Sequence, residues 1–157
     1  MRLTSINFES REQAAVVTPS GLVPVAHINS QLKKSWPIDM LGLIEQGIDN
    51  VLADDAAKIK TTISRTSVKL APLYRRPRKI WGIGLNYLDH AKDLNAPYPT
   101  APASFMKNDN TIIGPGDVIE LPPQSERVTA EAELGLIIGR TCRAVSEKDA
   151  VSYLAGY

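Results

Sequence analysis

The stretch TAEAELGLIIG, residues 129–139, constrains the fold more than any other part of the chain. Side chains alternate between the two faces of a β-strand, so Glu131 and Glu133 share one face, which continues with Gly135 and Ile137. The opposite face carries only alanine, leucine and isoleucine side chains. A strand that is apolar on both faces is typical of one covered on both sides. The sequence therefore predicts a long buried strand with two carboxylates at its beginning.

Glu131 and Glu133 are candidate ligands of a divalent cation. Carboxylates two residues apart on a strand converge on a point between them, and hard oxygen ligands suit Mg²⁺, Mn²⁺ or Ca²⁺. The alternative is an outward face in contact with water, which is what a Glu-x-Glu pair usually indicates. Two carboxylates at the mouth of a buried strand would repel each other and lose hydration, and a bound cation relieves both costs. The apolar strand therefore weakens the case for a solvated face and keeps the metal site open.

The first half of the chain reads as a small segment of strands followed by helices. Residues 1–28 alternate around a turn-forming cluster, Thr18 to Gly21, and predict short strands, the last of which contains His27. Residues 37–63 predict two helices, the first ending near Gly47. A short strand follows at residues 68–70.

The sequence pattern changes at Lys79, from predicted helices to predicted strands. A buried strand that ends in a loop is expected for KIWGIGLNY, a short strand for ASFMK, and two more strands around the turn Gly114–Asp117. Ser146 opens a capping-box pattern that predicts a helix to about Leu154. The chain is thus expected to be α+β and rich in strands. Its predicted domains are an N-terminal one over residues 1–70 and the first part of a catalytic one over residues 78–157.

His90 and Asp93 are candidate catalytic residues. If residues 87–95 are helical, their spacing of three places both side chains on one side of the helix. A carboxylate beside an imidazole orients the ring and raises its basicity, as a general base acting on water requires. The alternatives are a surface histidine on a polar helix, or a mobile flap instead of a helix. Tyr87 and Lys107 are the predicted substrate-binding residues, although a surface position for Lys107 fits the sequence equally well.

Composition and charge exclude several classes of protein. Lysine and arginine number 18 against 17 aspartate and glutamate residues, so no overall field favours nucleic acid or anionic membranes. No apolar run approaches the roughly 18 residues that span a bilayer. The N-terminus has no secretory pattern and the single cysteine, Cys142, has no internal partner, which predicts a cytoplasmic protein. Gly82 and Gly84 lack the third glycine of a dinucleotide fingerprint.

Taken together, several segments resemble the fumarylacetoacetate hydrolase family, continuously from Val68 to Tyr157. The motifs GLNYxxH, IGPGD and EAELxxxIG occur in the family's order. The matching stretches are KLAPL, KIWGIGLNYLDHAKDL, PASFMKNDNTIIGPGD, AEAELGLIIGR and AVSEKDAVSYLAGY.

The resemblance implies a rolled mixed β-sheet, usually in a homodimer, with a cation on Glu131 and Glu133. It also implies that His90 pairs with an acidic residue three positions on, where this chain has Asp93 and many small relatives have glutamate. The implied reaction is metal-assisted, enolate-forming chemistry on β-dicarbonyl or 2-oxo acids, ending in hydrolysis of a carbon–carbon bond, decarboxylation or isomerisation.

The family usually continues for about a hundred residues past the AGY segment, with a third carboxylate ligand and a lysine. A truncated chain that is inactive by itself, or a non-catalytic dimerisation module, is therefore the alternative expectation.

Overall fold

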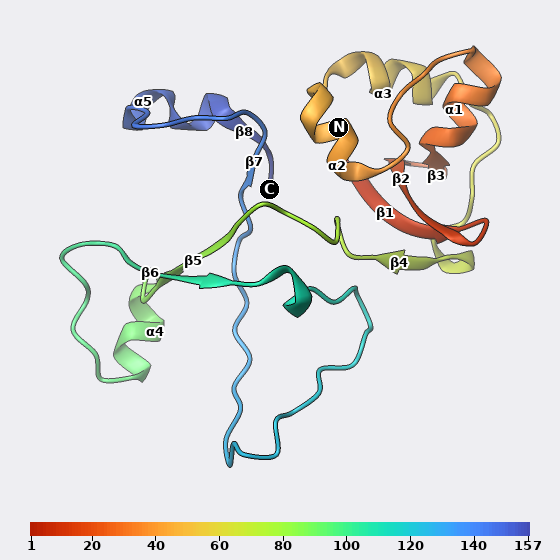
Figure 1. The fold of residues 1–157 in the computed structure, drawn as a ribbon. Coiled ribbons are helices and arrows are strands. Elements are labelled where there is room, and N and C mark those ends of the chain that lie inside the picture. The colour runs from red at the N-terminus through yellow and green to blue at the C-terminus, as the bar shows by residue number, and fades with distance from the viewer. The chain divides into compact units, whose positions relative to one another are not determined.

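The structure is a computed structural model that describes residues 1–157 (Figure 1). It contains two compact units. Unit 1 comprises Met1–Tyr74 and Ile113–Tyr157, and unit 2 comprises Arg75–Ile112. The predicted domain boundary between residues 70 and 78 stays a prediction, since the two compact units are not consecutive halves of the chain.

A four-stranded antiparallel sheet of order β3-β2-β1-β4 forms the framework of unit 1. Its strands are β1 (Leu3–Phe8), β2 (Arg11–Thr18), β3 (Gly21–Pro24) and β4 (Lys69–Ala71). The strands predicted within residues 1–28 and at 68–70 are therefore present. Glu9 and Ser10 join β1 to β2 with φ angles of 50° and 60°, so this two-residue turn uses the left-handed region without a glycine.

Three helices follow the hairpins: α1 (Val25–Leu32), α2 (Met40–Gln46) and α3 (Asn50–Ala57). Asp39 caps α2 by accepting a hydrogen bond from the Gly42 amide at 2.8 Å, and Asp49 caps α3 through the Val51 amide at 2.9 Å. Gly47 ends α2, as predicted. The prediction that His27 lies in a strand is wrong, because α1 begins directly after Pro24 and includes it.

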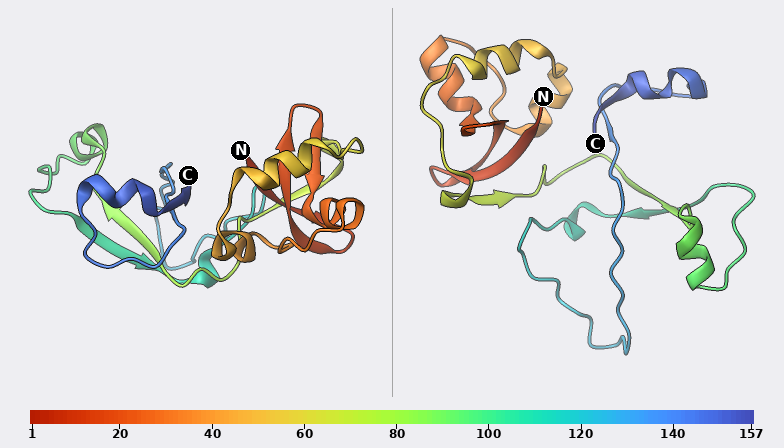
Figure 2. Two further views of the ribbon diagram at one scale, coloured as in Figure 1. Left: turned by 90° about the horizontal axis from the view of Figure 1, so that it is seen from above. Right: turned by 180° about the vertical axis from the view of Figure 1, so that it is seen from behind.

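Alternation along β2 places apolar side chains on both faces of the sheet. Ala14 and Val16 pack with the three helices, whereas Ala15 packs on the other face with Ile6 and Leu22. The helix-side core also contains helical residues that are buried almost completely: Val25, Ile28, Met40, Leu43, Ile44, Leu52 and Ala56. Figure 2 shows the helices gathered beside this sheet in both views. This is the largest apolar core of the protein.

Unit 2 is a two-stranded antiparallel ribbon with one short helix. Strand β5 (Ile80–Gly84) pairs with β6 (Ala103–Lys107), and α4 (Leu88–Asp93) lies in the connection. The predicted ASFMK strand is confirmed. The prediction of a buried strand at KIWGIGLNY is only half right, because the strand forms but Trp81 is 58% exposed. A ribbon of two strands has no second layer to cover its faces.

Residues 113–157 differ most from the predictions. The two strands expected around the Gly114–Asp117 turn are absent, and only the 3₁₀ turn η2 (Asp109–Thr111) precedes it. The long strand expected over residues 129–139 is reduced to β7 (Ile137–Ile138), which pairs with β8 (Leu154–Gly156). Val118 and Leu134 are 81% and 65% exposed. The physical reason is pairing: no segment of this chain hydrogen-bonds to residues 118–136 as a neighbouring strand.

The helix predicted from Ser146 begins as expected and ends earlier. α5 (Glu147–Ala150) passes into the 3₁₀ turn η3 (Val151–Tyr153), and the chain then enters β8. The predicted α+β class is confirmed. The expected rolled sheet is not closed: the strands form one four-stranded sheet and two separate pairs. None of the helices is both long and apolar enough to cross a membrane.

Candidate functional site

The segment that carries His90 and Asp93 is helical, which is the first of the two alternatives that the sequence leaves open. α4 begins after Tyr87, and the amide of Leu94 donates to the carbonyl of His90 at 3.2 Å, so the last turn is intact. His90 is half-buried and Asp93, the last helical residue, is exposed. Their spacing places both side chains on one side of the helix. The histidine can therefore keep one face against the protein while its carboxylate neighbour reaches solvent.

The other charged residues of α4 interact with each other. Lys92 Nζ lies 2.9 Å from Asp89 Oδ1, and the Asp89 side chain is 93% exposed. Such an exposed ion pair contributes little to stability. It leaves Asp93 as the acidic residue one helical turn from His90, which is what the sequence predicts for an orienting carboxylate.

Tyr87 and Lys107 lie at different ends of the ribbon in unit 2. Tyr87 immediately precedes α4, shortly after the end of β5 at Gly84. Lys107 is paired with Ile80, at the beginning of β5, and its Nζ lies 5.9 Å from the centre of the Phe105 ring. Five residues of strand separate the two ends by about 13 Å. The ribbon therefore does not bring Lys107 next to the helix that carries His90.

Glu131 and Glu133 lie in the irregular part of unit 1, and both are exposed. The buried strand that supported the metal site is absent here. Burial therefore does not cost these carboxylates their hydration, and it gives no reason for a bound cation. No cluster of three or more histidine, cysteine, aspartate or glutamate side chains in the chain could hold a metal ion. The two carboxylates fit a divalent cation in kind, as hard oxygen donors, but not in number.

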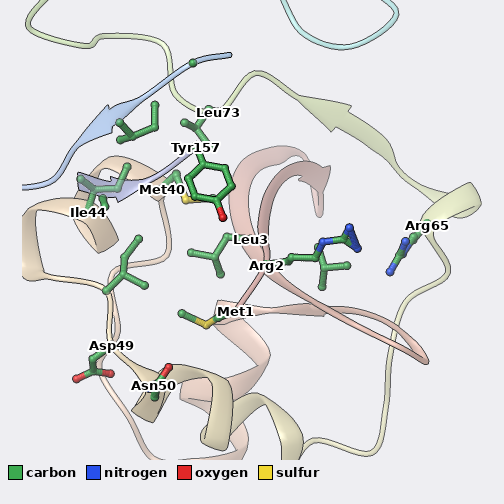
Figure 3. A pocket seen from close by; sticks show the side chains of 16 residues that line it. Met1, Arg2, Leu3, Met40, Ile44, Asp49, Asn50, Arg65, Leu73 and Tyr157 are labelled. Atoms are coloured by element: carbon green, nitrogen blue, oxygen red, sulfur yellow. The ribbon is translucent and has the colours of Figure 1, made fainter. Parts of the chain in front are cut away.

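A pocket of about 1220 Å³ lies in unit 1 (Figure 3). Its lining is mainly apolar, and Figure 3 shows Arg2 and Arg65 on the same side of it. The lining residues come from residues 1–73 and from β7, β8 and their flanking residues: Met1, Arg2, Leu3, Val17, Met40, Ile44, Ile48, Asp49, Asn50, Arg65, Leu73, Gly135, Ile137, Ala155, Gly156 and Tyr157. None of the six predicted site residues is among them. Sequence patterns gave no indication of this pocket, since its walls come from distant segments.

One clear electrostatic perturbation is structural. The side chain of Asp55 is buried, and it accepts hydrogen bonds from Lys58 Nζ at 2.8 Å and from Trp36 Nε1 at 3.2 Å. Lys34 Nζ lies 3.2 Å from the same carboxylate. The hydrogen bond from Lys58 is the main cause that lowers the pKa of Asp55 to about 2, with Trp36 and Lys34 adding to it against the opposing effect of burial. This cluster ties α3 to the segment after α1, and no predicted site residue belongs to it.

Known proteins align with most of the chain. The family model described as "Fumarylacetoacetate (FAA) hydrolase C-terminal" matches residues 79–157. A 2,4-didehydro-3-deoxy-L-rhamnonate hydrolase of Sphingomonas sp. is 43% identical over 123 residues, which cover 76% of this chain and 42% of that protein. The mitochondrial oxaloacetate tautomerase FAHD2A of Homo sapiens is 42% identical over 88 residues, or 56% of this chain and 28% of the relative.

The fold comparison agrees with the sequence comparison. The solved structure of a fumarylacetoacetate hydrolase from Exiguobacterium antarcticum matches with a TM-score of 0.68 and 21% identity, over 98% of this chain and 52% of that one. The chain thus spans about half the length of the solved relative and 42% of the 2,4-didehydro-3-deoxy-L-rhamnonate hydrolase it matches. The predicted resemblance is confirmed: this chain belongs to the fumarylacetoacetate hydrolase family.

Proposed function

We propose that this chain contributes the His90–Asp93 helix and the Glu131–Glu133 segment to an enzyme that forms an enolate from a 2-oxo acid. The observation that carries the proposal is the position of His90 and Asp93, one turn apart on α4, inside the region that the family model matches. The relatives' names support the substrate class. Oxaloacetate is a 2-oxo acid, and the rhamnonate derivative is named as didehydro at positions 2 and 4.

Hydrolysis of a 2,4-dioxo acid is the reaction we favour. His90 would take a proton from water, whose oxygen adds to the C4 carbonyl. The C3–C4 bond then breaks, and its electron pair passes into the enolate of the 2-oxo acid. Protonation at C3 completes the products, a carboxylic acid and a 2-oxo acid. Asp93 would orient the His90 ring and stabilise its protonated form.

Glu131 and Glu133 are proposed as two ligands of a divalent cation, Mg²⁺ or else Mn²⁺ or Ca²⁺. A bound cation supplies charge stabilisation to oxygen atoms that become negative. Two carboxylates alone hold Mg²⁺ weakly, because that ion gives up its waters reluctantly. No step of the reaction above is therefore assigned to the cation. Tyr87 is the proposed substrate-binding residue near His90, and Lys107 remains one at the far end of the ribbon.

The test is turnover by the purified chain in the presence of Mg²⁺ or Mn²⁺. Acetylpyruvate would be followed by the loss of its enol absorbance and by pyruvate release, and oxaloacetate by its enol–keto conversion. We expect pyruvate release that falls by at least a hundredfold in His90→Asn. Asp93→Asn should lower it less, and Lys92→Gln on the same helix should leave it unchanged. Equal activity in the wild type and His90→Asn would refute the catalytic assignment.

A second candidate function is a non-catalytic, dimer-forming module. The absence of a third ligand near Glu131 and Glu133 favours it. Sedimentation of the purified chain decides the oligomeric part, and a dimer with no turnover on either substrate would support this candidate over the enzyme. The homodimer and the cytoplasmic location remain proposals, and cell fractionation tests the location, because several relatives are named mitochondrial.

A further inference from the structure

The chain is held firmly at the point where it leaves unit 1. Strand β4 pairs with β1, with Ser5 opposite Ala71 and Asn7 opposite Lys69. Just beyond β4, the buried hydroxyl of Ser5 donates to the carbonyl of Leu73 at 2.6 Å. The backbone is therefore fixed to the main sheet up to the last residues before unit 2 begins at Arg75.

The chain is also held where it returns to unit 1. The Gly114 amide donates to Asp117 Oδ2 at 2.8 Å, and the Asp117 amide donates to the Gly114 carbonyl at 3.0 Å, so residues 114–117 form a closed turn. Gly114 is buried. A Cβ atom at this position would lie 3.0 Å from Cδ of the buried Pro72 and 3.1 Å from its nitrogen. The turn is therefore seated against the residue that follows β4.

An ion pair also joins this turn to β4. Lys69 Nζ lies 2.6 Å from Asp117 Oδ1, and the two side chains are 62% and 25% exposed. Asp117 thus uses one carboxylate oxygen for its own turn and the other for β4. An isolated exposed pair would contribute little. Here the pair shares its carboxylate with a backbone hydrogen bond, next to a glycine–proline contact so close that a Cβ atom would force Pro72 to shift by a few tenths of an ångström.

We propose that Lys69, Pro72, Gly114 and Asp117 form a clamp that holds together the two chain ends of unit 2. Every residue of this base clamp belongs to unit 1, and the segment between its halves is unit 2 in its entirety. Bringing the ends of a long segment together costs conformational entropy, and contacts that keep them together reduce the number of arrangements open to the segment. Unit 2 carries Tyr87, His90, Asp93 and Lys107, so the clamp restricts the part of the chain with most of the candidate site residues.

Limited trypsin digestion and amide hydrogen exchange test the base clamp without reference to catalysis. The linker after Tyr74 contains Arg75, Arg78 and Lys79, which are trypsin sites next to the clamp. Lys69→Gln removes the ion pair, and Gly114→Ala adds a methyl group that pushes the turn away from Pro72. We expect each variant to increase linker cleavage at least threefold and to speed exchange in residues 75–112, with exchange in β1 and β2 unchanged.

Lys92→Gln is the matched control, because it breaks another exposed lysine–aspartate pair, 2.9 Å long, inside unit 2. It should leave linker cleavage at the rate of the wild type. The proposal is overturned if Lys69→Gln and Gly114→Ala digest and exchange like the wild type. It is equally overturned if exchange rises to the same extent in β1 and β2, since these residues would then stabilise unit 1 in general.

Discussion

Replacing Leu52 by alanine tests whether unit 1 has the core described above. Leu52 lies in α3, its side chain is fully buried, and it packs with residues of β2, β3, α1 and α2. Leu52→Ala removes three carbon atoms from this cluster. At about 0.8 kcal/mol per buried methylene, the transfer loss alone is about 2.4 kcal/mol. A cavity that does not collapse adds to it, so the expected loss of unfolding free energy is roughly 2–5 kcal/mol.

The neighbouring residue of the same helix provides the control. Val51 is 47% exposed, so Val51→Ala should change the unfolding free energy by no more than about 0.5 kcal/mol. Both variants shorten an apolar side chain in α3 and differ in burial. Helix propensity cannot explain a large difference between them, because alanine is the better helix former in both cases.

Urea denaturation followed by tryptophan fluorescence measures both variants. The chain has two tryptophans, of which Trp36 packs against the core of unit 1 and Trp81 lies in unit 2. A Trp81→Phe background therefore makes the signal specific for unit 1. With a slope of about 1–3 kcal/mol per molar urea, Leu52→Ala should lower the midpoint by about 0.7 M or more. A loss below about 1 kcal/mol, or equal losses in the two variants, would refute the placement of Leu52 in a packed core.

Three further predictions concern charge, backbone strain and the candidate metal ligands. The folded pKa of Asp55 is lowered from 3.8 to about 2, so its contribution to stability is complete above pH 3.8 and is lost as the pH falls toward 2. Asp55→Asn should therefore make the unfolding free energy of unit 1 depend less on pH between 3.8 and 2. An unchanged pH dependence in this range would contradict the buried cluster. Replacing Glu9 by asparagine and Ser10 by glycine should raise the unfolding free energy by about 1 kcal/mol, since both positions have positive φ. A lower urea midpoint would contradict the positive φ angles of this turn. Glu131→Gln with Glu133→Gln should leave the thermal midpoint unchanged, because both side chains are exposed, and should abolish any Mn²⁺ binding seen by calorimetry; retained binding would exclude these ligands.

Local sequence signals predicted the N-terminal sheet well. The β1–β2 and β2–β3 connections are short, and alternation of apolar residues with turn-forming residues is a strong indicator of such hairpins. Helix α1 was missed because LVPVAHI is a short apolar run, and periodicity alone does not separate a strand from a helix in such a run. The two helices predicted within residues 37–63 are present, but they are shorter than that range: α2 begins after its cap Asp39, and α3 begins after its cap Asp49.

The candidate site was predictable only in part for the same reason. The helix around His90 depends on neighbouring residues alone, and it forms at the predicted position. A metal site at Glu131 and Glu133 depends on two things that the local pattern does not contain: a partner strand that fixes their side chains on one face, and a third donor from elsewhere in the chain. Neither is provided by the residues around them, which are exposed and outside any ladder.

The contrast between β1 and the segment before β7 explains why. Both have strand-like sequences, but β1 has hydrogen-bonded neighbours on both sides, β2 from the adjacent hairpin and β4 from more than sixty residues away. A strand gains its stability from such neighbours, because unpaired backbone amides and carbonyls gain nothing by leaving water. The apolar pattern of residues 130–138 therefore suits this segment to a place in a sheet, but the pattern alone does not form a strand. Glu131 and Glu133 are placed by that pairing, so any condition or partner chain that orders the segment should also change how tightly they bind Mn²⁺. Hydrogen exchange of residues 129–139, measured beside the Mn²⁺ titration, would show whether the two change together, and binding without added protection would contradict this coupling.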